Sequence, residues 1–174
     1  MVKKRILAFL LILVIALGGF YFKNKNAAPK GPVQYYMSYI PESSSEPAPQ
    51  NSIKFDGCGP EYLVLIPSLN ATSGSLKEAL NELFTIDSFD FDGSSLVNPL
   101  YNSNAQVEVE NTQDKLIVDI NGSIISSGTC DDPRIIAQIE ETVKHYALDK
   151  PYSIRLNGSE SEWSCYGDMS GECK

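Results

Sequence analysis

An uncharged apolar segment near the N-terminus constrains this chain more than any other feature. Three cations at residues 3–5 precede the run Ile6–Phe22, and two further lysines follow it. As a helix, these 17 residues would be about 25 Å long at the α-helical rise, a little under the ~30 Å of a bilayer's hydrocarbon core. Basic residues before such a run keep the N-terminus inside. The segment therefore predicts export of the remaining chain.

The apolar run has two alternative fates. A cleaved signal peptide needs small residues before the cut, and Ala16 and Gly18 would serve. The run continues to Phe22, however, which favours an uncleaved anchor. We therefore expect residues 1–23 to be a signal anchor in a single-pass membrane protein, with a cytoplasmic N-terminus and an extracytoplasmic domain. The alternative is a secreted domain released by signal cleavage.

The charges divide sharply along the chain. Residues 1–30 contain six cations and no acid, which leaves 8 cations against 22 acids, a net charge of −14, after residue 30. Such a domain is repelled by the phosphates of nucleic acids. Nucleic acid is therefore excluded as a partner.

Four cysteines follow the apolar run, where the expected compartment permits disulfides. They are Cys58, Cys130, Cys165 and Cys173. Because no C-x-x-C pair is present, the spacing does not favour a zinc site. We expect one bridge from Cys58 to the body of the domain and a local bridge between Cys165 and Cys173. Pairing of Cys58 with a tail cysteine remains the alternative.

The anchor is followed by a segment of linker character. Residues 24–52 are expected to form a linker that contains one short strand, at 33–40, where apolar residues alternate. The Pro-, Ser- and Glu-rich residues 41–51 predict a mobile loop, because they cannot bury enough apolar surface to order themselves. We place the start of the folded body near Ile53.

The sequence of the folded body predicts a strand, a helix, a hairpin, a second helix and a last strand. Residues 62–66 predict a buried strand, and Ser75 followed by Glu78 predicts a capping box at the start of a helix. The helix would turn one apolar face inward, made of Leu76, Ala79, Leu80 and Leu83. Residues 106–110 and 115–120 alternate in polarity on either side of a polar turn, which predicts a hairpin.

A second helix is expected to follow the hairpin. Asp131 and Asp132 predict its cap, with Pro133 in the first turn, where the missing amide costs nothing. Its predicted buried stripe is Ile135 or Ile136, Ile139, Val143 and Tyr146. Residues 152–156 then predict a last strand. The order of elements indicates an α+β fold with two helices packed on one face of a small antiparallel-rich sheet, preceded by an N-terminal transmembrane helix.

Catalytic or metal-binding constellations are not evident. His145 is expected on the helix surface together with Gln138 and Glu141, without a nucleophile or an orienting acid. Asp87, Asp90 and Asp92 lie close together, as in a calcium loop, but their spacing departs from that of an EF-hand. We interpret them as a solvated loop in which Phe89 and Phe91 pack inward. We therefore predict no catalytic, cofactor-binding or metal-binding residues.

Several short motifs resemble the GerMN domain, a sporulation and spore germination module. The resembling stretches are Gly128–Val143 (GTCDDPRIIAQIEETV), Tyr152–Gly158 (YSIRLNG), Leu76–Leu83 (LKEALNEL) after Ile66-Pro67, and Lys115–Asp119 (KLIVD). The likeness covers roughly residues 53–158, which leaves 159–174 as a cysteine-containing tail. It implies a noncatalytic domain of bacterial envelope proteins, commonly membrane-tethered, with a fold similar to ring-building modules of secretion-like assemblies.

The expected function follows from these features together. We expect a membrane-tethered extracytoplasmic module that binds or assembles with envelope proteins or peptidoglycan, in a sporulation or germination role or as a self-associating assembly. The alternatives are a secreted, disulfide-stapled binding domain and a cell-wall hydrolase. An assay of wall hydrolysis that responds to substitution of the three clustered aspartates would favour the hydrolase.

Overall fold

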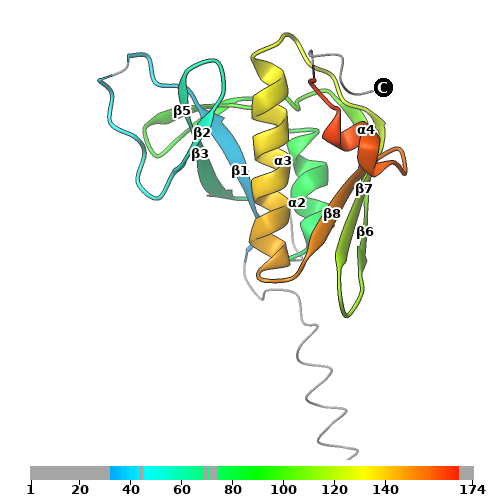
Figure 1. The fold of residues 1–174 in the computed structure, drawn as a ribbon. Helices are drawn as coiled ribbons and strands as arrows, with labels where there is room; N and C mark the ends of the chain where they lie inside the picture. Colours follow the sequence, from blue (N-terminus) through cyan, green and yellow to red (C-terminus); the bar gives the residue numbers. More distant parts are fainter. Residues whose placement is uncertain (1–31, 44, 69, 71–73, 169–174) are drawn as a thin grey trace, which may run out of the picture. The chain divides into compact units, whose positions relative to one another are not determined.

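The computed structural model describes residues 32–168, apart from 44, 69 and 71–73. Within this part, the chain is an α+β protein with three helices and two mostly antiparallel sheets (Figure 1). The predicted order of strand, helix, hairpin, helix and strand is confirmed. The expected single sheet is wrong, because the strands divide between two sheets. The predicted transmembrane helix lies outside the described residues.

Sheet A has five strands, and β1 lies at its centre. The strand order is β2-β3-β1-β5-β4, with all neighbours antiparallel. The strands are β1 (Gln34–Tyr39), β2 (Ile53–Asp56), β3 (Pro60–Pro67), β4 (Phe89–Phe91) and β5 (Ser94–Val97). Tyr35 and Met37 of β1 are fully buried. The strand expected within the linker therefore belongs to the folded body, which begins well before Ile53.

Sheet B contains the predicted hairpin and the predicted last strand. Its strands are β6 (Asn104–Asn111), β7 (Leu116–Ser123) and β8 (Tyr152–Leu156), in the order β6-β7-β8. β6 and β7 pair antiparallel, with Val107 opposite Ile120. β7 and β8 pair in parallel and are connected through helix α3 (Asp131–Ala147). The alternating apolar residues of the hairpin face the core because successive side chains on a strand point to opposite faces.

The helices join the two sheets into one core. Helix α2 (Leu76–Leu83) contacts β1 and β6, while α3 contacts β1 and β8. The predicted inward face of α2 is buried, and the Ser75 hydroxyl accepts a hydrogen bond of 3.3 Å from the Glu78 amide, as the capping box predicts. A further helix, α4 (Glu160–Ser164), packs against β8 and buries Trp163 in the tail, where no element was predicted.

The start of α3 differs from the predicted cap. Within the described part of the chain, Cys130 occupies the cap position and no side chain caps the helix. The Asp131 carboxylate instead accepts a hydrogen bond of 3.0 Å from Arg134, one turn ahead. Arg134 also forms a bidentate pair, at 2.7 and 2.8 Å, with Glu61, which is 2 % exposed. The Cys58–Cys130 disulfide holds the same end of the helix.

The buried stripe of α3 contains polar residues as well as the predicted apolar ones. Ile135, Ile139 and Val143 are fully buried, as expected. Gln138, which was expected on the outer face, is fully buried too, as is Thr142. Both belong to the i, i+3, i+4 repeat that the isoleucines define. Gln138 was predicted on the outer face of α3 because it is polar, although its position in the repeat places it on the buried face.

Three polar side chains of α3, four residues apart, bond to the backbone of sheet A and form what we call the α3 ladder. Its bonds run from the Gln34 amide to the Tyr146 hydroxyl (3.0 Å), from the Tyr36 amide to the Thr142 hydroxyl (3.1 Å), and from the Gln138 amide group to the Val97 carbonyl (3.1 Å). β1 and β5 pair through only two residue pairs. The ladder thus satisfies backbone groups that a longer β5 would otherwise bond.

We expect the substitution Thr142→Val to lower the free energy of unfolding by about 1–3 kcal/mol, because valine keeps the shape but leaves the half-buried Tyr36 amide without its acceptor. Urea unfolding measures the change. Thr129→Val, at an exposed position, is the matched control and should stay within about 0.5 kcal/mol of the parent. Equal losses in the two variants would contradict the role of the ladder.

Leu148 occupies an unusual backbone conformation in the turn after α3. Its φ is 55° and its ψ is −119°, and the Lys150 amide donates a hydrogen bond of 3.0 Å to the Ala147 carbonyl across it. These angles match the first central position of a type II′ turn, which glycine normally occupies. The leucine side chain is 74 % exposed. Backbone strain of this kind costs about 1–3 kcal/mol of folding free energy. Burial of the leucine side chain does not offset this cost, because the side chain is exposed.

We expect Leu148→Gly to raise the free energy of unfolding by about 1 kcal/mol, since the relieved strain exceeds the entropy that glycine adds to the unfolded chain. Thermal and urea unfolding measure the gain. Leu148→Ala keeps the Cβ atom and hence the strain, so it should leave stability nearly unchanged. A glycine variant less stable than the alanine variant would show that the turn is unstrained.

Candidate binding groove

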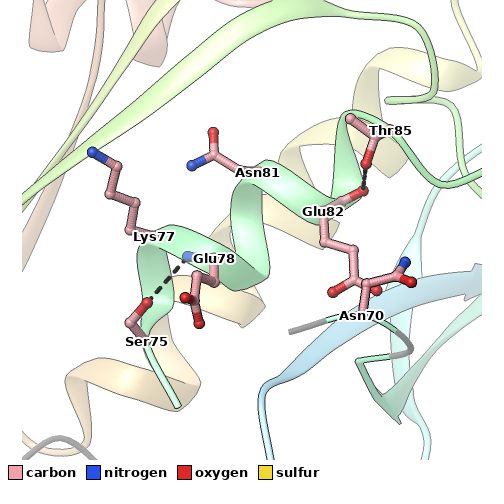
Figure 2. Close-up of a pocket in the computed structure, with 7 residues that line it drawn as sticks. All are labelled: Asn70, Ser75, Lys77, Glu78, Asn81, Glu82 and Thr85. Carbon is pink, nitrogen blue, oxygen red and sulfur yellow. Dashed lines mark hydrogen bonds between the residues drawn. The ribbon is translucent and has the colours of Figure 1, made fainter. Parts of the chain in front are cut away.

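A groove of about 560 Å³ runs along α2, and we call it the α2 groove (Figure 2). Polar side chains line it throughout: Asn70, Ser75, Lys77, Glu78, Asn81, Glu82 and Thr85. Most come from the helix itself, at spacings that place residues four apart on the same side. Glu78 and Glu82 accordingly project from one side of α2, and Lys77 and Asn81 from the other (Figure 2).

A second hollow, of about 490 Å³, continues the polar surface from α2 onto strand β6. It shares Lys77 and Asn81 with the α2 groove. Its other lining residues are Gln106, Val107, Glu108 and Asn121. The Asn81 side-chain oxygen accepts a hydrogen bond of 3.1 Å from the Val107 amide. This bond fixes the Asn81 rotamer, so that its amino group is presented at the boundary of the two hollows.

A buried carboxylate forms the floor of the α2 groove. Glu82 is 7 % exposed and accepts hydrogen bonds from the hydroxyls of Tyr35 (3.1 Å) and Ser68. Burial raises the pKa of Tyr35 above its ordinary value, and the neighbouring negative charge of Glu82 raises it further. Tyr35 lies on β1, Glu82 lies on α2, and Ser68 lies in the segment between β3 and α2. Their hydrogen bonds hold the groove in one shape.

The exposed part of the groove offers hydrogen bonds of both polarities. Lys77 is exposed and provides an ammonium group, while Glu78 is half-buried and provides a carboxylate. The amino group of Asn81 adds a neutral donor. Groups of this kind on a rigid helix are suited to a polar ligand with its own carboxylates, amides or hydroxyls. Its lining residues are all polar, and their aliphatic stems contribute the apolar part of its surface.

His145 lies half-buried on α3, where an exposed position was predicted. Its ring meets those of Tyr36 and Tyr146 edge to face, with centroid distances of 6.3 and 5.4 Å. Contacts of this kind are typical of a packed aromatic cluster. The position of His145 is therefore explained by the packing of α3 on β1.

The three clustered aspartates are all exposed. Asp90 lies in β4, and Asp92 with Gly93 forms the turn into β5, with φ of 49° and 77°. Phe89 and Phe91 are partly buried against the core, as predicted. Across the described ranges, no group of three or more His, Cys, Asp and Glu side chains could hold a metal ion.

The structure selects among the predicted disulfides. Cys58 and Cys130 are bonded, with their Cα atoms 5.3 Å apart and a sequence separation of 72. In the chain-entropy treatment, closing a loop of that length stabilises the fold by about 4 kcal/mol. Cys165 is not a free thiol, and its predicted partner Cys173 lies outside the described residues.

The predicted anchor, Ile6–Phe22, also lies outside the described residues. Among the helices that the structure does describe, none is both long and apolar enough to cross a membrane.

Most of the groove-forming residues were not singled out from the sequence, and Ser75 and Glu78 were named only as the capping box. Glu82 lies one position before Leu83, the last residue of the predicted inward face of α2, and the apolar repeat that predicts this face does not include it. Its partner Tyr35 belongs to a strand that was predicted as part of the linker. Only the pairing of β1 with β3 brings these two residues together, and such long-range pairing has no local signal.

No protein-family model, no curated protein and no solved structure matches this chain. The resemblance to the GerMN domain therefore stays a prediction.

We expect the free energy of unfolding to fall as the pH rises above 10, the ordinary pKa of tyrosine. A hydroxyl whose pKa is higher in the folded state stabilises the fold fully below its unfolded pKa and loses that contribution as the pH rises. Burial and neighbouring carboxylates raise the pKa of Tyr35 in this way, and the pKa values of Tyr39 and Tyr166 rise to about 12. Urea unfolding across this pH range measures the slope.

Tyr35→Phe should flatten this pH dependence, because it removes one of the contributing hydroxyls. Tyr101→Phe is the matched control, since Tyr101 is 37 % exposed, and it should keep the parent's slope. If the two variants had the same slope, ionisation of Tyr35 would not be linked to folding.

Proposed function

We propose that this chain is a noncatalytic, membrane-tethered extracytoplasmic module, similar to a GerMN domain, that binds peptidoglycan through the α2 groove. The observation that carries the proposal is the groove itself, which presents fixed donors and acceptors along a capped helix. Its site is a binding surface, and its ligand is retained without being cleaved.

The chemistry of the groove favours a glycan-peptide polymer over other envelope components. Peptidoglycan stems carry free carboxylates, amides and hydroxyls, and these match the Lys77 ammonium, the Asn81 amino group and the Glu78 carboxylate. The domain's net charge of −14 after residue 30 would repel an acidic polymer in general. Lys77 lines both hollows and supplies a local cation where a stem carboxylate would bind.

The rigidity of the groove supports a binding role. The Ser75 cap, the Asn81–Val107 bond and the hydroxyl bonds to Glu82 hold the groove from three sides. A preorganised site loses less conformational entropy when it binds. Tethering would confine the domain to the membrane surface and raise its effective concentration near the wall. A modest affinity per site would then suffice.

We expect the full-length chain, reconstituted in nanodiscs, to be retained by purified sacculi, and Lys77→Ala to weaken retention about tenfold, the effect of losing one hydrogen bond between charged groups. Lys54→Ala, at an exposed site on β2, is the matched control and should bind like the parent. Co-sedimentation over a range of sacculus concentrations measures the affinity.

The same incubation separates binding from hydrolysis. A noncatalytic module leaves the sacculi intact and releases no soluble fragments. Fragment release that is lost on substitution of Asp87, Asp90 or Asp92 would favour a hydrolase. Absence of retention, or equal retention of the two lysine variants, would contradict binding at the α2 groove.

A further inference from the structure

Three chain segments meet at one end of the described domain, which we call the tether end. They are residues 32–34 at the start of β1, residues 111–116 between β6 and β7, and residues 147–151 between α3 and β8. Figure 1 shows these segments at the same end of the fold. Their order along the chain makes the first of them the point nearest to the apolar N-terminal run.

Hydrogen bonds hold the three segments together. The Gln34 amide donates to the Tyr146 hydroxyl at 3.0 Å, which fixes the last turn of α3 beside the start of β1. The Lys150 ammonium donates to the Asn111 side-chain oxygen at 2.6 Å and to the Thr112 carbonyl at 2.8 Å. The tether end is therefore one preformed surface.

Leu148 projects from this surface. Its backbone conformation is unfavourable for stability, and its exposed apolar side chain is unfavourable for solubility. Its side chain is 74 % exposed, more than any other large apolar side chain of the described chain. Its positive φ suits glycine, not leucine. A strained and exposed apolar residue indicates a contact outside the domain, because strain of this kind persists where function requires it.

The charges of the tether end differ from those of the rest of the domain. Lys115 and Lys150 balance Asp114 and Asp149, so its three segments carry no net charge, while residues 31–174 carry −14. An anionic lipid surface repels the domain as a whole but does not repel this end. The polar turn residues around Leu148 suit the headgroup region.

The distance to the apolar run is short. Nine residues, 23–31, lie between Phe22 and the first described residue. A segment of nine residues can span at most about 30 Å. The tether end is thus the part of the described domain that the fewest residues connect to the apolar run.

We infer that the tether end rests on the bilayer and that the Leu148 side chain inserts at the boundary between headgroups and acyl chains. The inference rests on the proposed membrane tethering and adds a fixed contact between domain and lipid. The insertion of one apolar side chain is weak by itself, but the tether makes it intramolecular. The domain then has one preferred orientation on the membrane.

Quenching by brominated lipid tests the contact. The full-length chain with Leu148→Trp is reconstituted into phosphatidylcholine vesicles that contain anionic lipid, with or without bromine on the acyl chains. Brominated lipid should remove roughly half of the emission that the introduced tryptophan adds to that of Trp163, since insertion brings the ring to the acyl boundary. Ile125→Trp is the matched control, because Ile125 is 46 % exposed and follows the opposite end of β7. Its added emission should be unaffected.

A flotation step on the same samples separates the two proposals. A chain that floats with the vesicles and shows selective quenching at position 148 supports both. A chain that floats without selective quenching overturns the lipid contact and leaves the tethering intact. A chain that does not float overturns the tethering and the lipid contact together.

Photolabelling of the unmodified full-length chain covers the case in which the tryptophan variant misfolds. Vesicles that contain a lipid with a diazirine in its acyl chain are irradiated, and the cross-linked peptides are identified by mass spectrometry. The peptide that contains Leu148 should be labelled, and the peptide that contains Ile125 should not. Labelling of both peptides or of neither overturns the inference.

Discussion

The unpaired edge of β1 is the constraint on which the rest of the structure depends. β5 pairs with β1 only at Ser38 and Tyr39, so the first half of this central strand lacks a neighbour on that side. Buried amides need a partner, and the α3 ladder provides it from side chains spaced by four. Along this half of β1, side chains of α3 take the place of a strand. Sheet A continues past β1 only through the short strands β5 and β4, and β6, β7 and β8 form a separate sheet. α3 contacts both sheets and thereby closes a single core.

The two ends of α3 are fixed by different chemistry. At its start, a disulfide attaches the helix to the turn between β2 and β3, and the pair between Glu61 and Arg134 attaches it to the beginning of β3. At its end, hydrogen bonds to the start of β1 and to the β6–β7 turn hold the last turn. α3 is thus held at both ends and along its length, and the groove forms on the other helix, α2.

The parts of this fold that could be predicted have local causes. The α2 face, the hairpin, the apolar stripe of α3 and strand β8 each follow from a repeat within a few residues. The central position of β1, the division into two sheets and the short strands β2, β4 and β5 depend on pairing between distant segments, which no local pattern encodes. Gln138 was misplaced and Glu82 was missed for a related reason. A polar side chain can be buried when a segment distant in the sequence supplies its hydrogen-bond partner. The α2 groove could not be predicted because it depends both on pairing between distant strands and on a buried polar side chain.

The antiparallel pairing of β1 and β3 also has a mechanical consequence. The two strands are in register over six residue pairs, and their hydrogen bonds run perpendicular to the strand direction. The N-terminal end of β1 lies beside the C-terminal end of β3, with Gln34 opposite Pro67, and the chain continues from Pro67 to α2. A pull between the N-terminal segment and the α2 groove would therefore enter both strands at the same end, and the Gln34–Pro67 pair would be loaded before the pairs behind it.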